Sequence, residues 1–339
     1  MLGEPKTADQ QQPLKTTNND PMKINLVLCS MLMIFGSSPQ NLLHEKHHSP
    51  SKENRLESSP SSKNKVGYVV HVNSLTPYEL YLDDILIDFY YGNTISNTTE
   101  LNPYLLGNGK HTLKIRFLPK EGASDKMLSP ADLIFDETAR WHLYFLKTVA
   151  DKNDPLGYSN ELDYTNGELK IKAPSTKVPF WEQTWALDVK DLPYQVKGWS
   201  ESEDLTKMDQ TVLQKEVVKY FSHLKDLLNS GKIEDFRKLC KKRDEELDVV
   251  TYTTPEDSKI DDQNNKDRLL KICPGNMQAL DNYEMKIYGN GKLVTLVISS
   301  GKYKNWSALM SKTPKGRVSS WGAILHRPKG STTLAMIRK

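Results

Sequence analysis

The feature that most constrains the fold is a series of short segments, from residue 66 onward, in which apolar and polar residues alternate. The clearest segment has Leu113, Ile115 and Phe117 on one face and Thr, Lys and Arg side chains between them. A period of two is that of a β-strand with one buried face. Asp83-Asp84 lies between two such segments and predicts a hairpin turn. The sequence therefore predicts a region built from short antiparallel strands.

Turn residues separate these segments, and no long helical period occurs among them. We expect further strands in the same region at Trp141–Leu146, Leu169–Lys172 and Trp181–Val189. Short strands joined by turns are typical of two packed sheets. We therefore predict an all-β, immunoglobulin-like sandwich over residues 66–195.

Helical periodicity begins after a polar segment that ends near residue 208. Asp209 is a suitable N-cap for an amphipathic helix that Asn229-Ser230-Gly231 would end. A second helix would follow from Ile233, and strands are expected from Val249–Thr253 to the C-terminus, with hairpins at Gly289-Asn290-Gly291 and near Pro328. Residues 205–339 are thus predicted to form an α+β domain with two helices packed on an antiparallel sheet.

Two helices followed by a long antiparallel sheet resemble the nuclear-transport-factor-2-like architecture, a cone-shaped α+β fold. The resemblance covers about residues 209–339 and rests on the order of the elements. It implies a pocket between helix and sheet that can serve either an enzyme or a binding module. Enzymes of this family use paired polar side chains in the pocket, and the matching candidates here are Tyr220, His223 and Asp226. A polar outer helix face explains these residues equally well.

The first 65 residues contain little that can form a core. Residues 1–21 are polar and are predicted to be a disordered extension. Residues 22–38 contain a lysine, an apolar stretch and small residues, as in a secretory signal peptide. Met22 would then be the true start, or the leader is atypical; a short buried helix is the alternative. Residues 39–65 are rich in Ser, Pro and Lys and are predicted to be a flexible linker.

Composition supports this division. Hydrophobic residues make up 37% of the chain, below the usual share of about 45–50%, as expected if part of the chain builds no core. Three cysteines exclude a dense disulfide framework. Cys29 would be removed with the leader, and Cys240 and Cys273 are either a disulfide of an exported protein or two buried thiols.

Motifs of common catalytic and metal sites are absent from the sequence. It contains no nucleophile elbow, phosphate-binding glycine loop, zinc-protease helix or paired CxxC. The linker histidines His44, His47 and His48 are interpreted as incidental, and Asp83-Asp84 as a solvated turn without the other ligands of a calcium loop. We therefore expect no metal and no cofactor.

Charge is distributed unevenly although the formal net charge is only +3. Residues 292–339 contain ten basic and no acidic residues. Such a segment either faces acidic helices within the fold or attracts an acidic partner. The candidate partner-binding residues are Lys304, Trp306, Lys312, Lys315, Arg317, Arg327 and Lys329.

These observations predict a non-enzymatic protein, exported to the periplasm or cell envelope, that binds an acidic protein partner. In its small size, predicted export and lack of catalytic motifs, the chain resembles immunity proteins that neutralise periplasmic toxins. We expect no binding to nucleic acid. We expect contact with the membrane only through the leader. The alternative is a ligand-binding protein or a hydrolase- or isomerase-like enzyme that uses the pocket of the C-terminal domain.

Overall fold

The computed structural model describes a continuous C-terminal part of the chain and several shorter segments before it. The described residues are 65–92, 95–123, 125–133, 142–149 and 167–338. The predicted extension and signal-like segment, and all of the predicted linker except Lys65, lie outside the described residues. The same holds for Cys29 and the linker histidines.

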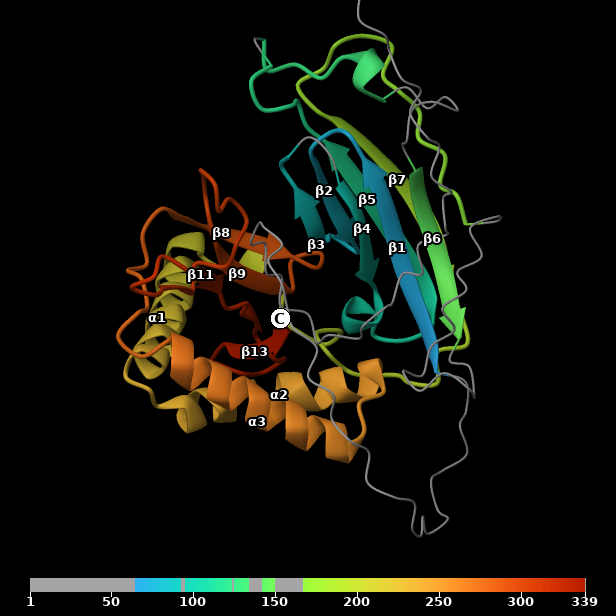
Figure 1. Ribbon diagram of the computed structural model, residues 1–339. Helices are drawn as coiled ribbons and strands as arrows, with labels where there is room; N and C mark the ends of the chain where they lie inside the picture. Colours follow the sequence, from blue (N-terminus) through green and yellow to red (C-terminus); the bar gives the residue numbers. More distant parts are fainter. Residues whose placement is uncertain (1–64, 93–94, 124, 134–141, 150–166, 339) are drawn as a thin grey trace, which may run out of the picture. The chain divides into compact units, whose positions relative to one another are not determined.

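Seven strands of the described residues precede residue 190 and form two antiparallel sheets (Figure 1). One sheet has the order β3-β2-β5-β7 and the other β4-β1-β6. The strands are β1 Val66–Ser74, β2 Tyr78–Leu82, β3 Ile85–Tyr90, β4 Ile95–Glu100, β5 Gly109–Phe117, β6 His142–Val149 and β7 Trp181–Val189. The all-β character predicted for this region is confirmed. The predicted strand at Leu169–Lys172 is wrong, because only an isolated bridge between Tyr144 and Glu168 forms there.

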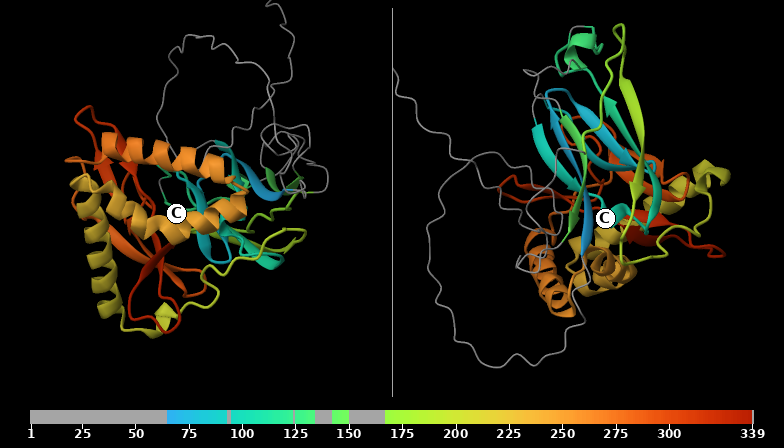
Figure 2. Two further views of the ribbon diagram at one scale, coloured as in Figure 1. Left: turned by 90° about the horizontal axis from the view of Figure 1, so that it is seen from below. Right: turned by 90° about the vertical axis from the view of Figure 1, so that its right-hand side faces the viewer.

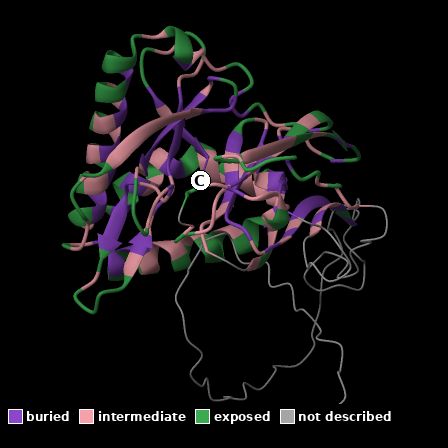
Figure 3. Ribbon diagram, turned by 90° about the horizontal axis from the view of Figure 1, so that it is seen from above, coloured by how far each residue is buried: buried purple, intermediate pink, exposed green. Residues whose placement is uncertain are grey.

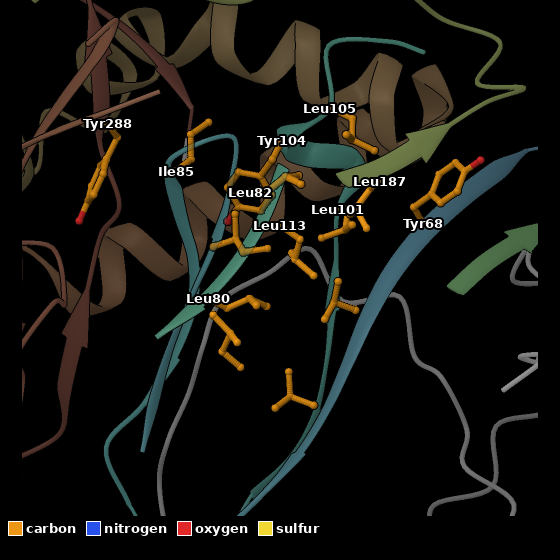
Figure 4. Close-up of a cluster of buried hydrophobic side chains, with 14 of the residues drawn as sticks. Tyr68, Leu80, Leu82, Ile85, Leu101, Tyr104, Leu105, Leu113, Leu187 and Tyr288 are labelled. Carbon is orange, nitrogen blue, oxygen red and sulfur yellow. The ribbon is translucent and has the colours of Figure 1, made fainter. Parts of the chain in front are cut away.

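Apolar side chains of both sheets belong to one buried cluster. Leu80 on β2, Leu113 on β5 and Val70 on β1 are completely buried in it, and Figure 4 shows Leu80, Leu82 and Leu113 among the neighbouring leucines. The cluster also includes Tyr288 and Ile337 from the C-terminal part of the chain. The strand alternation thus places one face of each sheet in a common core.

A bulge interrupts the predicted alternation of β3. The pairing of β2 with β3 shifts between Leu80 and Tyr81, which turns Asp88 inward and leaves Phe89 only partly buried. The buried Asp88 accepts hydrogen bonds from the Tyr78 hydroxyl at 2.7 Å and from Asn97 at 3.1 Å. A bulge reverses the faces that a strict period of two would assign.

The C-terminal part of the described chain contains three helices and two further antiparallel sheets. One sheet has the order β13-β12-β9-β8 and the other is the hairpin β10-β11. The helices are α1 Gln210–Asn229, α2 Ile233–Thr251 and α3 Pro255–Ile272. The strands are β8 Tyr283–Tyr288, β9 Leu293–Ile298, β10 Met310–Lys312, β11 Val318–Ser320, β12 Ile324–His326 and β13 Ala335–Arg338. The predicted combination of helices with an antiparallel sheet is therefore present.

Helix α1 begins as the sequence predicts. The Asp209 side chain accepts hydrogen bonds from the backbone N–H groups of Thr211 and Val212 at 2.8 and 3.0 Å. These bonds satisfy two of the free donors of the first turn. Buried positions recur along α1 at spacings of three and four residues. In the described part of the molecule, many exposed positions (green in Figure 3) lie on helices and loops.

The predictions of only two helices and of a strand at Val249–Thr253 are wrong. Helix α2 continues to Thr251, and α3 follows after a tight turn at Tyr252, whose φ is 59°. Helix α3 runs beside α2 (Figure 2), and Arg237 and Asp262 form an ion pair between them. Helix α3 was missed because it carries few apolar residues, of which only Leu269 and Ile272 are buried.

Candidate functional site

Two groups can be distinguished among the basic residues of the C-terminal segment. Arg327 and Arg338 form ion pairs inside the fold, with Glu216 on α1 and Glu246 on α2. Lys304 is nearer the surface, with its ammonium 3.9 Å from the buried Glu79 and 5.0 Å from the Tyr91 ring centroid. Part of the basic segment thus faces acidic groups of the same chain.

The second group lies on the hairpin β10–β11. Lys312, Lys315 and Arg317 are all exposed there. The turn is tight, since the Gly316 N–H donates to the Thr313 carbonyl at 2.8 Å and Gly316 has a φ of 79°. A positive φ of this size suits glycine. The turn therefore holds Lys315 at its tip with the other two cations beside it.

The hairpin is fixed to the segment that follows α3. The Lys312 N–H donates to the Asn276 carbonyl at 2.9 Å, and the Gln278 N–H donates to the Met310 carbonyl at 2.8 Å. On the other side, the Trp321 N–H donates to the Leu309 carbonyl at 2.8 Å. These backbone bonds connect the hairpin to the segments on both sides of it, near the C-terminal end of α3.

Two more cations lie on the last turns of α3, and one of them contacts the base of the hairpin. The Arg268 guanidinium lies 5.0 Å from the ring centroid of the buried Trp321. Burial and the nearby charge of Arg317 lower the pKa of Arg268. Lys271 is exposed in the final turn. We refer to Arg268, Lys271, Lys312, Lys315 and Arg317 as the basic cluster.

The basic cluster lacks internal compensation. Among the described residues, no carboxylate lies within the 4.0 Å ion-pair distance of its charged groups. The C-terminal end of α3 supplies a partial negative charge that favours nearby cations by about 0.3–1 kcal/mol each. The charge of Arg317 adds to burial in lowering the pKa of Arg268, so an anionic group placed here would meet uncompensated positive charge.

The remaining candidate partner residues lie elsewhere. Trp306 is half-buried and packs on Tyr303 with ring centroids 4.9 Å apart. Lys329 is exposed in the β12–β13 hairpin, where its charge adds to the hydrogen bond and charge of Lys197 in lowering the pKa of Glu201. The hairpin β10–β11 therefore brings together three of the seven residues.

The candidate pocket residues on α1 do not converge. His223 and Asp226 are exposed on the outer side of the helix, whereas Tyr220 is half-buried. Burial, with the nearby Cys240, raises the pKa of Tyr220, and a hydrogen bond with the Met336 backbone opposes this shift. The three side chains thus face two different environments.

Cys240 and Cys273 are both free and buried. Burial raises the pKa of the Cys240 thiol to about 11 and that of the Cys273 thiol to about 12. Both are therefore protonated thiols at neutral pH, in keeping with the second of the two alternatives considered above.

The structure contains a serine–histidine pair that the sequence did not predict. The Ser202 hydroxyl and His326 Nδ1 are joined by a hydrogen bond of 2.7 Å, and His326 is buried. Burial and the charges of Lys242 and Arg338 lower the pKa of His326 to about 4. The other ring nitrogen has no hydrogen-bond partner among the described residues. The pair therefore lacks the carboxylate that orients the histidine in a catalytic triad.

No group of three His, Cys, Asp or Glu side chains lies close enough to hold a metal ion within the described part of the chain. Likewise, none of the helices there has the length and apolar character needed to cross a membrane.

Comparison with protein-family models, with curated proteins and with solved structures finds no match to this chain.

Proposed function

We propose that this chain is a non-enzymatic binding protein whose basic cluster docks an acidic protein partner. The observation that carries the proposal is the absence of a carboxylate partner for these five cations within the described residues. A folded protein gains nothing from repulsion between Arg268 and Arg317 unless another molecule relieves it. Uncompensated charge of this kind favours fast association and selects for an oppositely charged surface.

The support of the hairpin fits this proposal. A partner that meets a preordered surface loses less conformational entropy on binding than one that must first order a loop. The backbone bonds to Asn276 and Leu309 hold the hairpin strands in place before binding. The buried Trp321 beneath Arg268 limits the positions that this guanidinium can take. Arginine beside an aromatic ring is a frequent anchor of protein interfaces.

The wider setting of this function is also a proposal. Residues 22–38 would direct the chain to the periplasm or cell envelope, and the acidic partner would be a toxin or an envelope component. An immunity protein that neutralises a periplasmic toxin is the specific case. The β region would be an immunoglobulin-like sandwich, and the C-terminal region a variant of the nuclear-transport-factor-2-like architecture with a third helix.

The direct test is affinity capture with the full chain from envelope extracts of the source cells and of neighbouring strains, followed by mass spectrometry. The test variant reverses Lys312, Lys315 and Arg317 to Glu. The matched control reverses Lys215, Lys219 and Lys259, which are exposed helical lysines without an ion pair among the described residues. Both variants change the net charge by the same amount, so nonspecific attraction is equal in the two.

We expect one stoichiometric, acidic partner that the wild type and the control retain and the hairpin variant loses. Equal capture by both variants, or a partner without acidic surface, would contradict the proposal. Circular dichroism of each variant establishes that the fold is intact.

A further inference from the structure

Two hairpin turns that are far apart in the sequence meet on one side of the sheet β3-β2-β5-β7. The β2–β3 turn contains Asp83 and Asp84, both in the left-handed region with φ of 47° and 66°. The Gly289 N–H of the β8–β9 turn donates to the Asp84 carbonyl at 3.4 Å, and the Asn290 N–H donates to Asp84 Oδ2 at 3.3 Å. The two turns are thus held together at Asp84.

A polar cavity of about 170 Å³ opens beside this junction. Strands β5 and β7 contribute to its wall, since Lys114 and Thr184, which are paired across these two strands, both line the cavity. The lining residues are Asp83, Asp84, Thr112, Lys114, Thr184 and Asn290. This volume is below the range of about 300–1,000 Å³ that is typical of drug-sized ligands. The cavity therefore fits a molecule of only a few heavy atoms.

One of the two carboxylates already has partners within the protein. Asp83 accepts from the Thr112 N–H at 2.8 Å and lies 2.5 Å from His111 Nδ1. Burial lowers the pKa of His111, but the hydrogen bond and charge of Asp83 outweigh it and raise the pKa. Asp83 therefore serves to hold the turn and His111, and it leaves Asp84 as the carboxylate available to a ligand.

The opposite charge comes from Lys114. Its ammonium lies over the Tyr81 ring, 4.6 Å from the centroid, and 3.9 Å from Glu182. At 3.9 Å the ammonium and Glu182 form an ion pair that is too long for a hydrogen bond, so the N–H donors of Lys114 can still reach a ligand. The side chains of Thr112, Thr184 and Asn290 have no hydrogen bond within the described residues. The lining therefore combines three neutral polar groups, one ammonium and two carboxylates, of which Asp83 is engaged by His111.

We propose that this cavity binds a free α-amino acid, with the ligand ammonium against Asp84 and the ligand carboxylate against Lys114. Charges of opposite sign at one small cavity match a zwitterion, and the hydroxyl and amide groups can satisfy its remaining donors and acceptors. None of the lining residues is aromatic, so the cavity offers a sugar ring no flat surface for stacking. This site is independent of the basic cluster.

The test is a nuclear magnetic resonance titration of the isotope-labelled full chain with each standard L-amino acid, monitoring the backbone amides of Thr112 and Thr184. L-alaninamide, which lacks the carboxylate, N-acetyl-L-alanine, which lacks the ammonium, and D-glucose serve as comparison ligands. The test variants are Asp84→Asn, which keeps a residue that tolerates the left-handed region, and Lys114→Gln. The control variants are Lys110→Gln and Asp188→Asn, an exposed ion pair of 3.4 Å on the same two strands.

We expect saturable shifts with at least one amino acid and none with the three comparison ligands. Asp84→Asn and Lys114→Gln should each raise Kd about tenfold or more, because each removes one charged hydrogen bond, and the controls should leave Kd unchanged. The proposal is overturned if no amino acid gives saturable shifts. It is also overturned if glucose or a blocked derivative binds as tightly, or if the two test variants bind as the wild type does.

Discussion

The Arg268 guanidinium lies over the ring of Trp321, and burial together with the charge of Arg317 lowers the pKa of Arg268. Two arginines that repel each other without a carboxylate between them are costly in a free protein. Functional surfaces often contain groups that lower the stability of the free protein, because the same groups bind the ligand or partner.

Replacing Arg317 with glutamate should stabilise the free protein. The repulsion would become an exposed or half-exposed ion pair, worth about 0.2–1 kcal/mol. We expect the free energy of unfolding in urea to rise by this amount at low salt and the gain to shrink at high salt. Lys215→Glu, on an exposed face of α1, is the control. If the free energy of unfolding of Arg317→Glu is lower than that of Lys215→Glu, repulsion between Arg268 and Arg317 does not destabilise the protein significantly.

The ion pair of Arg338 and Glu246 is expected to be important for folding. The Arg338 side chain is 1% exposed, donates to Glu246 at 2.8 Å and to the Pro103 carbonyl at 2.9 Å, and lies over the Trp199 ring. Glu246→Gln would leave the arginine charge buried without its counter-ion, at a cost of about 3–5 kcal/mol.

The surface pair Lys197 and Glu201 is the matched control for that experiment. Its side chains are 64% and 61% exposed, so Glu201→Gln should leave the free energy of unfolding nearly unchanged. Urea unfolding of the two glutamine variants measures both values. Similar small losses would mean that Arg338 finds water or another acceptor.

A pH effect is expected from His326. Its pKa is about 4 in the folded protein against an ordinary value of 6.5. The unfolded chain therefore binds a proton more readily than the folded protein between these two values. The contribution of His326 to the free energy of unfolding is complete above about pH 6.5. It falls as the pH is lowered to about 4 and is constant below that pH. The loss from this one group is up to about 3 kcal/mol.

His326→Asn isolates that contribution, since the asparagine can keep the hydrogen bond to Ser202 but does not titrate. We expect the difference in unfolding free energy between wild type and variant to change across this pH range. A difference that is constant with pH would contradict the neutral, buried state of His326.

A buried carboxylate connects the β2 strand with the loop after β9. Glu79 accepts hydrogen bonds from the hydroxyls of Tyr81 and Tyr91, both at 2.7 Å, and from the Asn305 amide at 3.2 Å. Burial raises the pKa of Glu79, but the two tyrosine hydroxyls and the charges of Lys304 and Arg116 outweigh it and lower the pKa. Glu79 is thus held as an anion.

Asn305→Asp should therefore destabilise the fold strongly, because it replaces a donor with a second buried negative charge. We expect a loss of about 2 kcal/mol or more at pH 7. The loss should become smaller as the pH falls and the new carboxyl group takes up a proton. Asn264→Asp, on an exposed position of α3, should have little effect. An equal response of the two variants in urea unfolding would argue against the Glu79 network.

Local patterns predicted many of the elements, because their causes lie within a few residues. Strand β7 and the hairpin at Asp83-Asp84 formed where period-two alternation and turn residues placed them. The Asp209 cap is equally local. The inward turn of Asp88 was not predictable, since it depends on how β3 pairs with β2 and not on its own sequence.

Helix α3 shows a signal that was available and overlooked. Thr254 caps it, Pro255 occupies its first turn, and Glu256 and Asp257 follow, which is a strong N-terminal pattern. Apolar periodicity is weak there because much of the helix is exposed. Without α3, neither Arg268 nor the base of the hairpin could be assigned to the candidate site.

The sequence also could not separate the cations of the last 48 residues. Arg327 and Lys315 look alike in composition, yet Arg327 is paired with Glu216, more than one hundred residues away along the chain, and Lys315 is exposed at a turn. Such pairings are products of tertiary packing.

The central claim is most directly tested by the affinity of the captured partner for the full chain, measured by calorimetry at low and moderate salt. We predict that reversing Lys312, Lys315 and Arg317 to Glu weakens binding by two orders of magnitude or more, at about 1 kcal/mol for each desolvated charge contact. The salt dependence of binding should also largely disappear. Reversal of Lys215, Lys219 and Lys259 should leave the affinity within about twofold of the wild type. Equal affinity of the two variants, or binding by the wild type that does not depend on salt, would contradict the account.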